Sequence, residues 1–229
     1  FIIIAIINAV NLIDGIDGLA ATVSIIIFTV FSLIFYYVGN YFLFLTCLVM
    51  VGTLLAFLRF NFSKSNKIFM GDTGSMILGF MISVMVLRFL MLEDAALAKL
   101  PFQQENIPYV IFAILIVPFF DTARVFFIRL MNKRSPFSPD RNHIHHLIID
   151  HYQISHGKAS LWLGAFHFVA VLFLSGMAML VSQWYMLLII SIVLFAAVAY
   201  FFFINKPRLL RAMKYQKRIK VWRKHKMAS

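Results

Sequence analysis

Long apolar runs separated by short polar segments make up most of the sequence. An α-helix needs about 20 predominantly apolar residues to cross the hydrocarbon core of a bilayer. Runs of this length predict six membrane-spanning helices, preceded by the truncated end of another apolar helix. The expected spans are 19–38, 41–60, 75–92, 108–130, 161–182 and 184–204, and the truncated helix covers 1–11.

The predicted fold class is all-α: a polytopic transmembrane helix bundle with six full spans and one N-terminal truncated span. Pro118 lies inside the fourth run, where it removes a backbone donor and predicts a kink. Residues 1–204 are expected to form the membrane domain and 205–229 a basic tail. The chain starts at Phe1, inside an apolar run and without methionine, so we expect it to be the C-terminal part of a longer protein.

The composition supports a membrane protein. Hydrophobic residues make up 62% of the chain and its mean hydropathy is +0.89, whereas soluble domains contain about 45–50% apolar residues. The single cysteine, Cys47, excludes an internal disulfide and a cysteine metal site.

The basic residues predict the orientation of the spans. If the connector 12–18 is cytoplasmic, alternation places 61–74, 131–160 and 205–229 on the same side. All of the 21 Lys and Arg residues except Arg88 and Lys99 then lie in or near cytoplasmic segments, as the positive-inside rule requires.

The tail carries ten Lys and Arg and no acid between residues 206 and 226, which favours contact with anionic lipid. Nucleic-acid binding would use the same charges, but nothing else in the sequence supports it, and we predict no nucleic-acid partner.

The first polar segment, Asn11–Ala20, has Asp14 and Asp17 each followed by glycine. Acidic residues at a membrane boundary are costly unless they face water, a cation or a partner, so they favour a functional site. Glycine allows a ligand to approach the backbone closely.

The second segment is Lys67–Ser75, in which glycines and hydroxyl residues flank Asp72 directly before a span. Asp72 could bind a divalent cation while the amides at the start of the helix face a phosphate. Alternatively, Asp72 or Thr73 caps a helix that starts near Ser75. The residues alone leave both interpretations open.

The third segment is Ser135–His146. Ser138 followed by Pro139 is typical of a helix start, so the histidines are expected on a short helix with His143 and His146 on one face. Three interpretations stay open: phosphate or sugar binding beside Arg141, a solvated polar helix, and a zinc site with Asp150. Upstream, Asp121 and Arg124 lie one helical turn apart and could form an ion pair or bind a ligand.

These three segments resemble signatures of the polyprenyl-phosphate N-acetylhexosamine-1-phosphate transferases, glycosyltransferase family 4. The matching stretches are Asn8–Ala20, Phe69–Ser75 and His143–His146, and the resemblance covers the chain to about residue 204. His-Ile-His-His after Ser-Pro-Phe-Ser-Pro-Asp-Arg is similar to the branch that transfers GlcNAc-1-phosphate from UDP-GlcNAc to undecaprenyl phosphate. The phospho-MurNAc-pentapeptide transferases usually carry three consecutive histidines instead.

The resemblance implies an enzyme that transfers a HexNAc-1-phosphate from a UDP-sugar to undecaprenyl phosphate and releases UMP. This is the first membrane step in assembling O-antigen, teichoic acid or similar envelope polysaccharides. It implies Mg²⁺, with Mn²⁺ as an alternative, and a bacterial inner-membrane location with the active-site loops 11–18, 61–75 and 131–160 and the tail in the cytoplasm. A homodimer stays open.

The resemblance also implies residue roles. Asp72 would bind the metal, with Asp14 and Asn11 shaping its surroundings or the nucleotide pocket. Gly15, Ile16 and Asp17 would form the uracil pocket, Phe69 would stack on the base and Lys67 would meet phosphate. Diphosphate or sugar would be held by Arg141, His143, His145 and His146. The predicted catalytic residues are Asp72, Asp14, Asp17, His145 and His146.

One family feature has no counterpart in the sequence. The family's adjacent Asp-Asp pair, which helps bind metal or activate the acceptor, is absent from all 229 residues. We therefore expect the segment to be inactive by itself. The alternatives are a phospho-MurNAc-pentapeptide transferase, a transporter with broken helices, and a non-catalytic lipid-binding scaffold.

Overall fold

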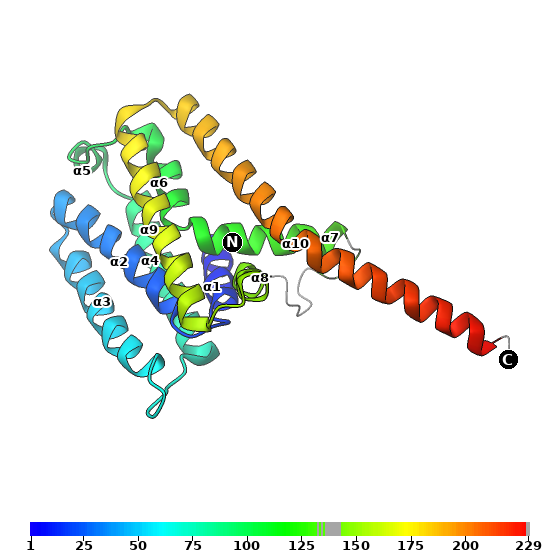
Figure 1. The fold of residues 1–229 in the computed structure, drawn as a ribbon. Coiled ribbons are helices and arrows are strands. Elements are labelled where there is room, and N and C mark those ends of the chain that lie inside the picture. The colour runs from blue at the N-terminus through cyan, green and yellow to red at the C-terminus, as the bar shows by residue number, and fades with distance from the viewer. Residues whose placement is uncertain (132, 134, 136–142, 228–229) are drawn as a thin grey trace.

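Eleven helical elements form the bundle in Figure 1, and no strand occurs among the described residues. The structure is a computed structural model that describes residues 1–227 except 132, 134 and 136–142, and beyond Asn205 it describes the backbone alone. The elements are α1 (Ile2–Ile13), α2 (Leu19–Val38), α3 (Tyr41–Asn61), α4 (Gly71–Leu90), α5 (Asp94–Leu97), η1 (Gln104–Asn106), α6 (Ile107–Ile114), α7 (Ile116–Met131), α8 (Ile144–Tyr152), α9 (His156–Leu180) and α10 (Gln183–Met227).

Five of these helices are long and apolar enough to cross a membrane: α2, α3, α4, α9 and the first 23 residues of α10. Taken together, the segment Gln104–Ile114 (η1 and α6) and α7 are also long and apolar enough to cross a membrane, but they are bent by 71° relative to each other. They form either a sixth, broken span or a re-entrant loop. With the shorter apolar helix α1, this arrangement confirms a polytopic all-α membrane bundle.

The fourth predicted span bends at its centre. The helix breaks at Leu115, whose backbone leaves helical geometry (ψ 12°), and α7 then runs across the bundle in Figure 1. Pro118 lies in the first turn of α7, where the missing N–H needs no partner. The expected kink in this span is therefore confirmed: the bend lies in the turn directly before Pro118, and the proline itself stands in the first turn of a new helix.

Small residues allow the helices that carry the site to pack closely. The helix α1 packs on α4, and α9 packs on α2. A Cβ atom at Gly79 of α4 would lie 2.6 Å from the Ile7 backbone of α1, and one at Gly164 of α9 would lie 2.6 Å from the Thr22 side chain of α2. These contacts fix the ends of α1, α2, α4 and α9 relative to one another.

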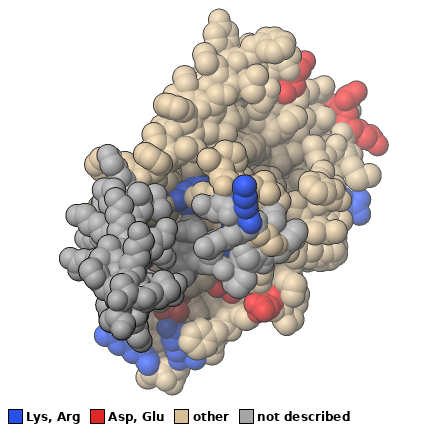
Figure 2. Space-filling view, turned by 90° about the vertical axis from the view of Figure 1, so that its right-hand side faces the viewer, with Lys and Arg blue, Asp and Glu red and all other residues tan. Residues whose placement is uncertain are grey.

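The polar connectors segregate to the two ends of the bundle. One end holds the α1–α2 turn, the α3–α4 loop, α8 and the start of α9, and the other holds α5 and the α9–α10 turn (Figure 1). Figure 2 shows acidic side chains projecting at the upper end of one face, and acidic and basic side chains together at its lower end. The first two polar motifs and the histidines of the third therefore lie at one end, as alternation of spans predicts.

The helix α10 continues through residue 204 without a break and ends at Met227. Its backbone extends away from the bundle beyond the membrane-length segment (Figure 1). Before this extension, Tyr200 contacts Tyr152 of α8 through their hydroxyl oxygens, 2.9 Å apart. The predicted boundary between membrane domain and tail thus falls inside one helix.

Candidate active site

The first polar segment forms a tight turn between α1 and α2. The backbone N–H of Asp14 bonds to the carbonyl of Asn11 as α1 ends. Gly18 adopts a left-handed conformation (φ 78°) immediately before α2, and a Cβ atom there would overlap the ring of Phe62. Only glycine satisfies both conditions without strain.

The second polar segment is joined to the first through a serine. Asn11 Nδ2 donates to Ser75 Oγ at 2.8 Å, and Ser75 Oγ donates to the carbonyl of Asp72 at 3.1 Å. The helix α4 begins at Gly71, four residues earlier than predicted, and no side chain caps it. The capping interpretation of Asp72 and Thr73 was therefore wrong: Asp72 lies in the first helical turn.

The charges of two carboxyl groups, those of Asp14 and Asp72, interact across this junction. Burial, and to a lesser extent the negative charge of Asp72, raise the pKa of Asp14 to about 6. A divalent cation would relieve this repulsion, and Mg²⁺ is commonly held by one or two carboxylates together with waters and substrate phosphates. The pair formed by Asp14 and Asp72 therefore fits Mg²⁺.

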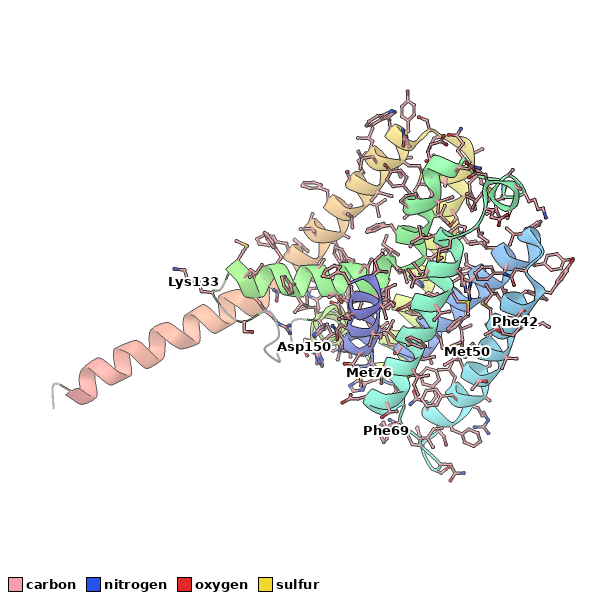
Figure 3. The ribbon with its side chains drawn as sticks, turned by 180° about the vertical axis from the view of Figure 1, so that it is seen from behind. Phe42, Met50, Phe69, Met76, Lys133 and Asp150 are labelled. Atoms are coloured by element: carbon pink, nitrogen blue, oxygen red, sulfur yellow. The ribbon has the colours of Figure 1, made fainter. Side chains whose placement is uncertain are left out.

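Asp17 is tied to two other elements. Its carboxylate lies 2.6 Å from Lys67 Nζ, and its backbone carbonyl accepts a hydrogen bond from Ser160 of α9. Lys67 Nζ also lies 5.2 Å from the ring centroid of Phe69, within cation–π range. Phe69 is 74% exposed and lies just before α4 in Figure 3. The predicted nucleotide residues Asp17, Lys67 and Phe69 thus meet on one surface.

Ile16, predicted for the same pocket, is 5% exposed and belongs to the hydrophobic core. The side chain of Ile16 therefore anchors the turn, and only its backbone can face a ligand. Gly15 is accessible from solvent.

The third polar segment folds back against the first. A Cβ atom at Gly15 would overlap the imidazole of His145, and the rings of His145 and His146 have centroids 4.3 Å apart. Among the described residues, neither ring nitrogen of His145 has a hydrogen-bond partner. The histidine helix and the acidic turn therefore form one site.

His145 is neutral at physiological pH. Burial lowers its pKa to about 4; the charge of Asp121 opposes this shift, and His146, His143 and His156 reinforce it. A neutral imidazole keeps one donor and one acceptor nitrogen. His145 can therefore both donate a hydrogen bond to a ligand and accept one from it.

His143 lies just outside the helix that was expected to carry it. It precedes α8 in extended backbone (φ −62°, ψ 149°), with Nδ1 3.0 Å from Asp121 Oδ2. Among the described side chains, no group of three or more His, Cys, Asp or Glu is placed to bind a metal. The zinc interpretation with His143, His146 and Asp150 is therefore wrong, because His143 faces α7. Arg141, Ser138 and Pro139 lie outside the described residues.

Sequence reasoning missed Ser160 and His156 and, although it singled out Asp121, did not identify the partner of that residue. Asp121 bonds the histidine segment, Ser160 holds the Asp17 turn, and His156 lies close enough to act electrostatically on His145. A buried acid in an apolar run was the one available signal, and it indicated Asp121 without indicating its partner.

Comparison with known proteins agrees with this geometry. Residues 1–90 match the glycosyl transferase family 4 model, and this region includes both acidic segments. An undecaprenyl-phosphate alpha-N-acetylglucosaminyl 1-phosphate transferase of Escherichia coli K12 is 30% identical over 152 residues. This part of the chain is thus similar to glycosyl transferase family 4.

Two matches define how far the similarity extends. The alignment with the Escherichia coli protein covers 65% of this chain and 39% of that relative. A probable undecaprenyl-phosphate N-acetylglucosaminyl 1-phosphate transferase of Bacillus subtilis is 38% identical over 114 residues, which are 50% of this chain and 29% of that relative. The matched regions thus span 29–39% of the length of these curated relatives. The relatives' names agree with the branch that the histidine motif predicts.

Proposed function

We propose that the full-length protein transfers GlcNAc-1-phosphate from UDP-GlcNAc to undecaprenyl phosphate, giving undecaprenyl-diphospho-GlcNAc and UMP. An oxygen of the lipid phosphate attacks the β-phosphorus of the donor, and the bond from that phosphorus to the bridging oxygen breaks as UMP leaves. The observation that carries the proposal is the junction of the first two polar segments with the histidine end of the third, where His145 lies against Gly15 and the charges of Asp14 and Asp72 interact.

Asp72 and Asp14 are the groups that would hold Mg²⁺ or Mn²⁺, which when bound would neutralise charge on the phosphate oxygens. Phosphoryl transfer depends mainly on positioning and electrostatic stabilisation. The site offers neutral His145 and its neighbours His143 and His146 for the diphosphate or sugar. The sequence motif adds Arg141 to this set.

The nucleotide would lie on the surface formed by Asn11, Gly15, the Ile16 backbone, Asp17 and Phe69. Lys67 currently pairs with Asp17 at 2.6 Å. A phosphate reaching Lys67 would therefore compete with the Asp17 carboxylate for it. The relatives' names support the GlcNAc branch, and the cytoplasmic placement of the site follows from the distribution of Lys and Arg.

A donor comparison with the full-length protein in detergent tests the proposal. With undecaprenyl phosphate and Mg²⁺, we expect UMP release from UDP-GlcNAc and its loss when EDTA removes the metal. UDP-GalNAc and UDP-MurNAc-pentapeptide serve as competing donors. Preference for the pentapeptide donor would favour the phospho-MurNAc-pentapeptide transferase alternative, and no release from any donor would contradict sugar-phosphate transfer altogether.

A further inference from the structure

We propose that Asp121 is a positioning residue: it grips the start of the histidine helix with both carboxylate oxygens and so fixes His143 and His145 for the reaction. This inference rests on the proposed transferase function. It assigns a task to a buried acid of α7 that lies outside the three polar motifs.

The contacts of Asp121 are specific. Its Oδ2 lies 3.0 Å from His143 Nδ1, and its Oδ1 accepts the backbone N–H of Ile144 at 2.9 Å. Asp121 is 0% exposed, and the partners lie 22 and 23 residues further along the chain. Both oxygens thus serve one segment that is distant in sequence.

The geometry fixes the proton on His143. A carboxylate accepts hydrogen bonds only, so Nδ1 of His143 carries its hydrogen toward Asp121 in both the neutral and the protonated ring. Toward a ligand, the Nε2 atom is then a hydrogen-bond acceptor in the neutral ring and a donor in the protonated ring. Orientation of a histidine by a carboxylate on its other nitrogen is a general way to fix a tautomer.

The same carboxylate satisfies one of the free amides at the N-terminus of α8. His143 itself makes no capping hydrogen bond, so Asp121 supplies the acceptor from another helix, as a capping side chain does. The ring planes of His143 and His145 are 11° apart, with centroids at 5.7 Å. A shift of the α8 start would therefore move His145 relative to Gly15.

Asp121→Asn separates positioning from bulk packing. An asparagine oxygen can still accept the Ile144 N–H, but its amide group faces His143 Nδ1 with a hydrogen and favours the opposite tautomer. We expect the kcat of UMP release to fall about 10- to 100-fold, as when a histidine loses its orienting partner, with the KM for UDP-GlcNAc changed less. Asp94→Asn, an exposed acid in α5 at the other end of the bundle, is the matched control and should retain wild-type kcat.

A double-mutant cycle of Asp121→Asn with His143→Gln tests whether Asp121 affects kcat through His143. If Asp121 acts through His143, each single variant should lose a similar factor in kcat, and the double variant should lose little more. Losses that multiply would overturn the proposal, as would a folded Asp121→Asn protein with wild-type kcat. If Asp121→Asn fails to fold, His143→Gln alone still decides, because near-wild-type kcat in that variant contradicts the proposal.

Failure of the transferase function is distinguishable from failure of this inference. If the wild-type protein releases no UMP from any donor, the proposed function is wrong. The double-mutant cycle is then measured through the thermal melting temperature in detergent instead of kcat. If the double variant lowers the melting temperature by less than the sum of the two single variants, Asp121 holds the start of the histidine helix through His143. Additive changes in melting temperature would overturn this inference.

Discussion

Replacing Asp72 with Asn is expected to abolish Mg²⁺-dependent UMP release by the full-length protein. Asparagine keeps the size of the side chain but removes the negative charge that acts on Asp14 and would bind the metal. Metal stabilisation of phosphoryl transfer contributes several kcal/mol, and about 4 kcal/mol corresponds to a loss of about 1000-fold in rate. Turnover is measured with UDP-GlcNAc and undecaprenyl phosphate over a range of Mg²⁺ concentrations.

Glu105→Gln is the control for the Asp72 variant, because Glu105 is an exposed acid at the other end of the bundle. It should retain activity and metal dependence. Undiminished turnover in Asp72→Asn would refute the metal assignment, even if the transferase function itself stands.

The Asp72 variant also has a signature in stability that does not depend on turnover. In the wild type without metal, Asp14 binds its proton more tightly in the folded state, with a pKa of about 6 against 3.8 for an unperturbed aspartic acid. Folding therefore becomes less favourable as the pH rises from the lower to the higher of these two pKa values. Because the charge of Asp72 contributes to the raised pKa, Asp72→Asn should weaken this pH dependence.

Gly15→Ala is expected to give the second large effect, a loss of about 10- to 100-fold in kcat, comparable to loss of an orienting contact at a site. The added Cβ would lie 2.7 Å from Cε1 of His145 and closer still to Nε2. His145 is 1% exposed, so its ring cannot move aside without disturbing the α8 packing. Such overpacking typically costs about 1–3 kcal/mol of stability.

Gly52→Ala is the matched control, because a Cβ there meets nothing within 4 Å. It should leave kcat unchanged and keep or slightly raise the melting temperature, since alanine favours a helix interior over glycine. Adding His145→Ala to Gly15→Ala should restore the melting temperature without restoring activity. Wild-type kcat in Gly15→Ala would show that the contact with His145 is not needed for the reaction.

Run length predicted the helices well where short turns join them. The predicted spans 19–38 and 41–60 agree with α2 and α3 to within one residue, because Gly39 turns the chain in a left-handed conformation directly after α2. The break at Leu115 lies within the turn that precedes Pro118, where a proline disrupts the helical hydrogen bonds, so the sequence predicted that the span bends but not the direction taken after the bend. The direction of α7 depends on its packing against α1 and α9.

Residue chemistry identified the site better than it identified the partners within it. Acids beside glycine indicated Asp14, Asp17 and Asp72, and the structure brings all three to one end of the bundle. The pairing of Asp17 with Lys67, and of Asp121 with His143, joins residues 50 and 22 positions apart. Such pairings are decided by helix packing, which the sequence pattern does not encode locally.

The central claim is that the three polar segments form one site on the cytoplasmic face, and labelling of single cysteines tests it most directly. In a Cys47→Ser background, Asp17→Cys, Asp72→Cys and His156→Cys should react with a membrane-impermeant thiol reagent in inside-out vesicles only. Asp94→Cys should react from the opposite face. Labelling of any of the first three from the face that exposes position 94 would contradict the account.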